Sequence, residues 1–91
     1  MVVVEDFLRF KVYHVLRELE KGPLIARVLG KRIGVNGSNV FRYVEKLEFY
    51  GLVETYFERE YPYRKIVKIT RKGRNFLKKL RELDRVLRRG W

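Results

Sequence analysis

The sequence has no cysteine, no glutamine, a single histidine and a single serine. Without cysteine, the chain can form no disulfide, no thiolate metal site and no cysteine nucleophile. Methionine occurs only at position 1, whereas charged residues make up 36% of the chain. Abundant charge with few thermolabile residues is typical of thermophile proteins, and we expect a protein of that kind.

Long apolar runs are also absent. A helix that spans a bilayer needs about 20 consecutive apolar residues, and no stretch of this sequence approaches that length. Residues 1–6 lack the basic start and the small-residue cleavage site of a signal peptide. We therefore expect a cytoplasmic protein without a membrane partner.

Charge of one sign dominates. The chain has 22 Lys and Arg against 11 Asp and Glu, which gives a formal net charge of +11. Such an excess opposes compaction by self-repulsion and favours a polyanionic partner. Nucleic acid and an anionic membrane surface both fit this charge.

The 91 residues suffice for one domain, and apolar periodicity with turn residues divides them into five elements. Gly22-Pro23 stops the first predicted helix, and Gly34 and Gly51 stop the next two. The predicted elements are a helix over 6–21 with Asp6 as its cap, a helix over 24–33, a helix over 38–50 with Ser38 as its cap, a hairpin over 52–70, and a helix over 71–89 with Thr70 as its cap. This order predicts an α+β fold that is mostly α.

The stretch from 22 to 54 and the junction Ile69-Thr-Arg-Lys-Gly-Arg74 resemble known proteins. Together with Leu47-Glu-Phe-Tyr-Gly-Leu-Val53 they are similar to the winged helix-turn-helix transcriptional regulators of bacteria and archaea, such as those like MarR, ArsR and PadR. The resemblance implies a three-helix bundle with a β-hairpin wing and a long C-terminal helix, of an archaeal or archaeal-virus type. Gly30 departs from the family, which usually has Ala where the two motif helices cross.

The predicted helix over 38–50 has two different faces. Val40, Val44 and Leu47 repeat at i, i+4 and i+7, so they are expected to face the core. The resemblance implies that another face of this recognition helix enters the DNA major groove, where Asn and Arg can read base edges. The alternative is an ordinary solvated helix face. The residues expected at DNA on this helix and its entry are Asn36, Ser38, Asn39, Arg42, Tyr43 and Lys46.

Further cations are expected at the phosphate backbone. Arg27, Lys31 and Arg32 lie on the helix that precedes the recognition helix, and such a helix crosses the phosphates in docked pairs. On the wing the candidates are Arg59, Arg64 and Lys65, but Glu58 and Glu60 sit among them. A merely structural hairpin is therefore the alternative for the wing, with Tyr61 packed against Tyr63.

Apolar residues of the first and last helices predict a homodimer. One domain of this size has little core to cover both apolar stripes, so we expect a seam between two copies, with two recognition helices about 34 Å apart on a palindromic site. The alternative is that the same residues complete the core of one copy. The seam residues are Phe7, Phe10, His14, Phe76, Leu80, Leu83 and Leu87.

The last helix is the most basic element, with nine Lys or Arg against two acids from Arg71 to Trp91. A helix of this composition can be a nucleic-acid surface, a membrane-surface helix or a solvated face beside a dimer seam. The place of Trp91 stays open.

No residue pattern indicates catalysis. Ser38 is expected to cap a helix, His14 to lie in the seam or core, and no phosphate-binding glycine loop, carboxylate pair or metal cluster is present. We therefore expect no enzyme, no cofactor and no metal, although the resemblance allows an effector pocket at the dimer interface. The expected function is a transcriptional regulator that binds double-stranded DNA. Its alternatives are an architectural protein that coats DNA and a winged-helix module that binds other proteins.

Overall fold

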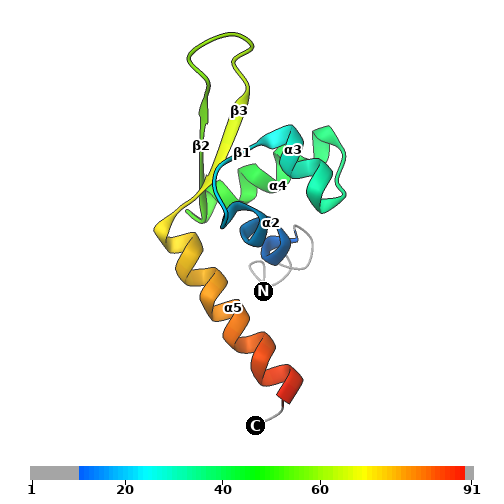
Figure 1. Ribbon diagram of the computed structural model, residues 1–91, viewed down its shortest axis with the longest axis vertical. Coiled ribbons are helices and arrows are strands. Elements are labelled where there is room, and N and C mark those ends of the chain that lie inside the picture. Colours follow the sequence, from blue (N-terminus) through cyan, green and yellow to red (C-terminus); the bar gives the residue numbers. More distant parts are fainter. Residues whose placement is uncertain (1–10, 90–91) are drawn as a thin grey trace.

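The computed structural model describes residues 11–89, which fold into four helices and a three-stranded sheet (Figure 1). In chain order the elements are α2 (Val12–Leu19), β1 (Leu24–Ile25), α3 (Ala26–Ile33), α4 (Gly37–Phe49), β2 (Val53–Phe57), β3 (Lys65–Ile69) and α5 (Arg71–Arg89). The mostly helical α+β winged-helix architecture expected from the sequence is confirmed.

The core forms where the apolar stripes of three helices meet one face of the sheet. Val15, Leu16 and Leu19 of α2 are fully buried, as their helical spacing predicts. Leu29 of α3 and Val67 of β3 are equally inaccessible. Val40, Val44 and Leu47 of α4, which the sequence predicted to face the core, are also buried, so that prediction is confirmed.

The sheet contains one strand more than the sequence predicted. Its order is β1-β3-β2, and β1 pairs antiparallel with the central strand β3, with Leu24 opposite Val67. The prediction of a helix over 24–33 was therefore wrong for its first two residues. Antiparallel pairing with β3 holds these two residues in an extended form, and Ile25 keeps extended dihedrals as the N-cap of α3. Tertiary pairing overrides the helical tendency of this short segment.

The entry to α4 also differs from the prediction. The helix begins at Gly37 and ends at Phe49, and its cap is Asn36 rather than Ser38. The Asn36 side chain accepts a hydrogen bond from the Asn39 backbone amide at 3.3 Å, and the Ser38 hydroxyl donates to that same side-chain oxygen. Asn and Ser are comparable cap formers, so the extended backbone at Asn36 decides between them.

The first helix is described only in part. Within the described residues it runs over Val12–Leu19, so it ends two residues before the predicted limit at position 21. The predicted cap Asp6 lies outside the described residues, as do Phe7 and Phe10. Lys11, just before α2, is held in left-handed backbone geometry and donates to the carbonyl of Ile33 at 3.2 Å.

Glycines stand at two close helix contacts. A Cβ on Gly30 would lie 3.0 Å from the carbonyl oxygen of Val35 and 3.1 Å from the Cβ of Val40, so the absence of a side chain lets α3 approach α4. A Cβ on Gly73 would overlap the carbonyl oxygen of Leu52. The first turn of α5 therefore packs directly against the backbone that leads into β2.

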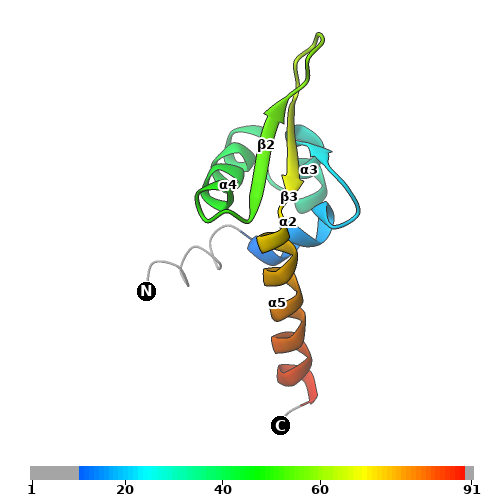
Figure 2. The same cartoon turned by 90° about the vertical axis from the view of Figure 1, so that its left-hand side faces the viewer.

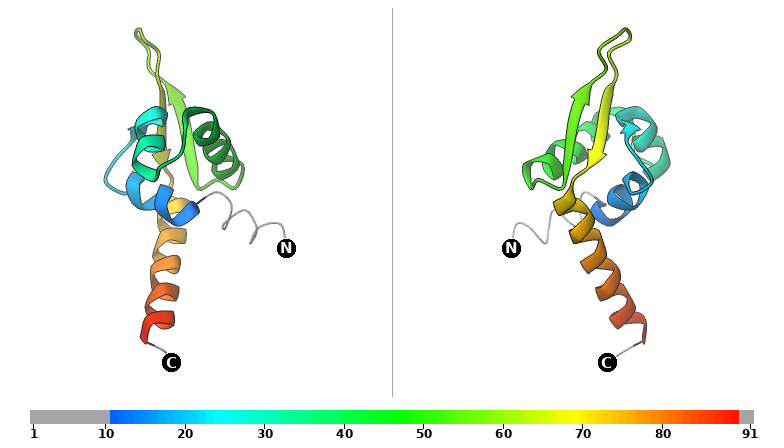
Figure 3. Two further views of the ribbon diagram at one scale, coloured as in Figure 1. Left: turned by 90° about the vertical axis from the view of Figure 1, so that its right-hand side faces the viewer. Right: turned by 60° about the vertical axis from the view of Figure 1, so that its left-hand side comes forward.

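Helix α5 leaves the domain and extends away from the wing (Figures 2 and 3). The Thr70 hydroxyl accepts a hydrogen bond from the Gly73 amide at 2.9 Å, so the predicted cap is confirmed, and the helix covers the predicted 71–89. Because α5 and the wing point to opposite ends, the molecule measures 52 × 22 × 21 Å.

Two hydrogen bonds fix the direction of α5. Arg81 donates to both carboxylate oxygens of Glu20, at 2.7 and 2.6 Å, and so ties the middle of α5 to the end of α2. The hydrogen bonds and the charge of Arg81 hold the pKa of the Glu20 carboxyl below its ordinary value.

Candidate nucleic-acid interface

Helix α4 presents a polar face to solvent. Val40, Val44 and Leu47 are buried, and Asn39 and Arg42 on other sides of the same helix are exposed. Because the core holds the helix by its apolar stripe, the backbone that carries these two side chains is held in place. An amide and a guanidinium on an exposed helix are the groups that read adenine and guanine edges.

Other predicted positions on this helix are less free. Tyr43 and Lys46 are half-buried, and the Tyr43 ring packs against the edge of the core. The Lys46 ammonium lies 6.0 Å from the centre of the Phe49 ring. Asn36 and Ser38 are exposed, and both take part in the cap of α4. The structure thus brings Asn39, Arg42, Tyr43 and Lys46 onto one helix, and of these four Asn39 and Arg42 are exposed.

Helix α3 adds cations beside α4. Arg27, Lys31 and Arg32 are all exposed. Arg32 makes an ion pair of 3.6 Å with Glu18 of α2, whereas Arg27 and Lys31 have no carboxylate partner among residues 11–89. Two of the three side chains predicted to contact DNA phosphates from this helix therefore carry a charge without a carboxylate partner.

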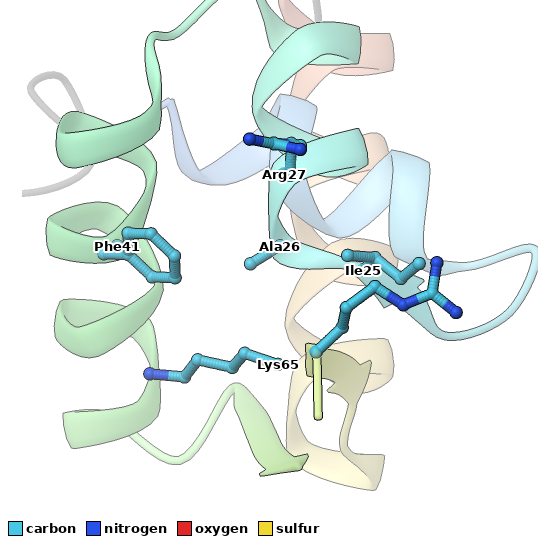
Figure 4. A pocket seen from close by; sticks show the side chains of 6 residues that line it. Ile25, Ala26, Arg27, Phe41 and Lys65 are labelled. Carbon is cyan, nitrogen blue, oxygen red and sulfur yellow. The ribbon is translucent and has the colours of Figure 1, made fainter. Parts of the chain in front are cut away.

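A shallow hollow lies where α3, α4 and the wing meet (Figure 4). Its volume is about 200 Å³, and its lining is mostly apolar with cations at the margin. The Lys65 ammonium reaches over the Phe41 ring at 5.7 Å from the ring centre, a distance at which a cation–π attraction acts. The lining residues are Ile25, Ala26, Arg27, Phe41, Arg64 and Lys65.

The sequence predicted the three cations of this hollow as DNA contacts but did not predict Phe41 and Ile25 as part of the site. Phe41 is 44% exposed and follows the core residue Val40 on the side of α4 that faces Lys65. An aromatic residue outside the core stripe of a polar helix is the sequence signal that could have indicated it. Ile25 could not be placed there without the unexpected strand β1.

The wing cations differ in their partners. Arg64 donates to both oxygens of Glu58, with the Nη2 to Oε2 distance at 3.1 Å, and its backbone amide donates to the same carboxylate. These hydrogen bonds lower the pKa of Glu58 and raise the pKa of Arg64. Tyr61 and Tyr63 pack edge to face at 6.2 Å, as the structural alternative for the wing expected. Arg59 is exposed and lacks a carboxylate partner among the described residues.

The predicted seam residues fall into two groups. Phe76 and Leu80 are half-buried, and Phe76 packs against the core. Leu83 and Leu87 are 55% and 75% exposed on the part of α5 that extends beyond the domain. The alternative in which these residues complete the core of one copy therefore fails for the last two leucines. His14 is exposed and stacks edge-on against Tyr13.

No cluster of three or more His, Asp or Glu side chains that could hold a metal ion occurs among residues 11–89. Over the same residues, none of the helices combines the length and apolar character needed to cross a membrane.

No protein-family model matches the chain, and neither does any curated protein sequence. Solved structures do. The transcriptional regulator BldR from Sulfolobus solfataricus is 32% identical, with a TM-score of 0.76 over 84% of this chain and 55% of that chain. PcaV from Streptomyces coelicolor, a transcriptional regulator solved with its natural ligand, is 25% identical, with a TM-score of 0.69 over 75% of this chain and 49% of that one. A PadR family transcription regulator from Clostridium difficile shares the fold at 18% identity and a TM-score of 0.76, over 85% and 88% of the two chains.

These similarities and the architecture agree. The chain is a winged helix-turn-helix domain, and it shares this fold with the transcriptional regulators BldR and PcaV. It spans about half the length of BldR and PcaV. All three of these neighbours are transcriptional regulators.

Proposed function

We propose that this protein binds double-stranded DNA as a homodimer and regulates transcription in the cytoplasm, with α4 in the major groove. The observation that carries the proposal is the exposure of Asn39 and Arg42 on a helix whose apolar side is held by the core. A B-DNA major groove is about 12 Å wide and admits an α-helix, and its base edges distinguish all four base pairs.

Contacts to the backbone would orient α4 in the groove. Arg27 and Lys31 of α3 are exposed without carboxylate partners among the described residues, and Lys65 stands at the base of the wing. Phosphate contacts of this kind set the register of a protein on the duplex without reading its sequence. Arg64 contributes less in this proposal, because Glu58 already accepts its hydrogen bonds.

A second copy would cover the exposed part of the α5 stripe. Leu83 and Leu87 are exposed on one face of a helix that projects from the domain (Figure 1). Burial of apolar surface is the main driving force of association. A two-fold axis at this stripe would present two copies of α4 to one duplex. Such a dimer prefers a palindromic site.

The reading face is tested by selecting bound sequences from a random duplex pool at a stated salt concentration. We expect a palindromic consensus, and we expect Arg42→Ala to weaken binding to it by about 1–3 kcal/mol, because a bidentate base contact is lost. Arg88→Ala removes the same charge from the far end of α5 and serves as the control. Equal affinity of the Arg42→Ala and Arg88→Ala variants for the consensus would reject α4 as the reading helix.

The dimer is tested by sedimentation equilibrium. Leu83→Glu with Leu87→Glu buries two charges in the proposed seam, so we expect a monomer that still binds a half-site but binds the palindrome no better. The control is Phe49→Glu, which changes a 79% exposed aromatic residue on α4 and should leave the dimer intact. A double variant that sediments like the parent protein would contradict the α5 seam.

A further inference from the structure

Helix α5 bears a row of cations along one face. Arg71, Lys78 and Arg85 follow one another at intervals of seven residues, and Arg89 continues the row four residues later. Seven residues are nearly two turns of α-helix, so these side chains project from the same side. The row extends over about 27 Å at 1.5 Å of rise per residue.

This cationic row lies opposite the apolar stripe. Successive residues advance by about 100° around a helix, which puts Lys78 and Arg85 on the side facing away from Leu83 and Leu87. All four members of the row are exposed. A second copy seated on the stripe would therefore leave the row open to solvent.

The acidic side chains near α5 are engaged by other cations. Glu20 accepts hydrogen bonds from Arg81, Asp84 pairs with Arg88, and Glu82 lies 3.6 Å from Lys79. Among residues 11–89, no carboxylate makes an ion pair with any member of the row. The net charge of this side of α5 is therefore positive, although Glu82 lies four residues after Lys78 and three residues before Arg85.

Folding does not account for this placement. The first turn of α5 contains no acid, and its cations, Arg71 among them, stand at the positive end of the helix dipole. Arg85 and Arg89 are like charges four residues apart, a spacing that destabilises a helix. A surface that costs helix stability and carries four cations against the single carboxylate of Glu82 is suited to a polyanion.

We propose that the cationic row of α5 binds the phosphate backbone of a second duplex segment, so that the protein bridges two DNA segments. The wing and the free end of α5 lie at opposite ends of the long axis (Figures 1 and 3). A duplex read by α4 therefore leaves the outer part of the row to a different segment. Duplex DNA carries one charge per about 1.7 Å of its axis, so an extended row of this length meets several phosphates. This proposal rests on the proposed function for the binding of the first duplex by α4. The binding of the second duplex depends on the row of α5 alone.

A membrane surface fits the same charges less well. An interfacial helix inserts its apolar face and keeps its cations near the headgroups. If the stripe of Leu83 and Leu87 entered a bilayer, Lys78 and Arg85 would point away from it. The aromatic residue of the stripe, Phe76, packs against the core of its own chain.

The test compares two double variants with equal charge loss on the same helix. Lys78→Gln with Arg85→Gln removes two central members of the row, whereas Lys79→Gln with Arg88→Gln removes two cations that already pair with carboxylates. Protein is loaded on a bead-bound duplex that carries the selected consensus sequence, and capture of a second, fluorescently labelled random duplex is measured at several salt concentrations. Circular dichroism confirms that both variants stay folded.

We expect the row variant to load on the first duplex like the parent protein but to capture the second about tenfold less, with a salt slope lower by about 2. The control variant should lose less than about threefold, since its cations are locally compensated. Equal loss in both variants, or unchanged capture by the row variant, would overturn the proposal. So would row-dependent binding to vesicles of phosphatidylcholine and phosphatidylserine without capture of a second duplex.

The same assay separates this proposal from the proposed function. An Asn39→Ala, Arg42→Ala variant with undiminished duplex loading would reject α4 as the reading helix and leave the row as a DNA site. Intact loading by the row variant without second-duplex capture by the parent protein would reject bridging and leave α4 as the reader.

Discussion

Helices α4 and α5 are both amphipathic, but the protein treats their apolar residues in opposite ways. In α4 the stripe of Val40, Val44 and Leu47 is completely covered by the same chain. In the 19 residues of α5 only Gly73 and Leu77 are buried, and Leu83 and Leu87 lie in solvent. The difference arises because α4 packs against α3 and β2, whereas the buried residues of α5 all lie before Arg81, which bonds to Glu20 of α2.

The contrast separates two tasks. A helix that is packed on one side by its own chain is held rigidly and can offer its other side as a preformed surface, as α4 does. In α5 the apolar stripe extends beyond the part of the helix that packs against the core. Its last leucines are therefore exposed and available to another copy. Three changes test this comparison.

The largest effect is expected where α5 belongs to the core. Leu77→Ala should lower the free energy of unfolding by about 3 kcal/mol, because Leu77 is fully buried and its truncation leaves a cavity. Leu87→Ala should leave the stability of the isolated domain nearly unchanged, since that side chain is 75% exposed. Urea unfolding at protein concentrations that favour the monomer measures both. Similar losses for the two leucines would mean that α5 is one uniform element and would break the comparison.

The base of α5 sharpens the comparison. Gly73→Ala should destabilise the protein by about 2 kcal/mol, because the new methyl group would collide with the carbonyl of Leu52 and force the helix outward. Gly37→Ala in the first turn of α4 meets open space and should stabilise by about 0.5 kcal/mol. Thermal unfolding followed by circular dichroism compares the pair, and a harmless Gly73→Ala would show that α5 is not docked as described.

The smallest effect concerns the ion pair that directs α5. The pKa of Glu20 is lowered in the folded protein, so its contribution to stability is present above the ordinary value near 4.5 and disappears as the pH falls through the lowered value. Glu20→Gln should therefore cost about 0.5 kcal/mol at neutral pH and nothing in strong acid, a value reduced by solvent screening. Glu45→Gln on α4 is the control. A cost of Glu20→Gln that does not change with pH would contradict a charge-based role.

Local patterns predicted much of this molecule. The spacing of Val40, Val44 and Leu47 was enough to orient α4, and Thr70 was enough to begin α5 at the correct residue. The strand β1 was missed because two residues carry no periodicity, and only the free edge of β3 holds them extended. The cap of α4 was assigned to Ser38 instead of Asn36, because two good cap residues in one turn differ only in backbone geometry.

The candidate interface was predicted in its residue types more than in its geometry. The exposure of Asn39 and Arg42 follows from helical periodicity alone. The sequence could not predict that Arg64 pairs with Glu58, because the hairpin register decides this contact. It could not predict the contact of Lys65 with Phe41 either, because that depends on how the wing approaches α4.

The sequence by itself determined the charge, the order of the elements and the apolar side of each helix, because these depend on residue type and on spacing along a single segment. Only the tertiary structure decided which apolar stripe is covered, which cations keep a free charge and where the two ends of the molecule point. Those properties depend on distances between segments far apart in the chain, such as Glu20 and Arg81, and no local pattern contains them.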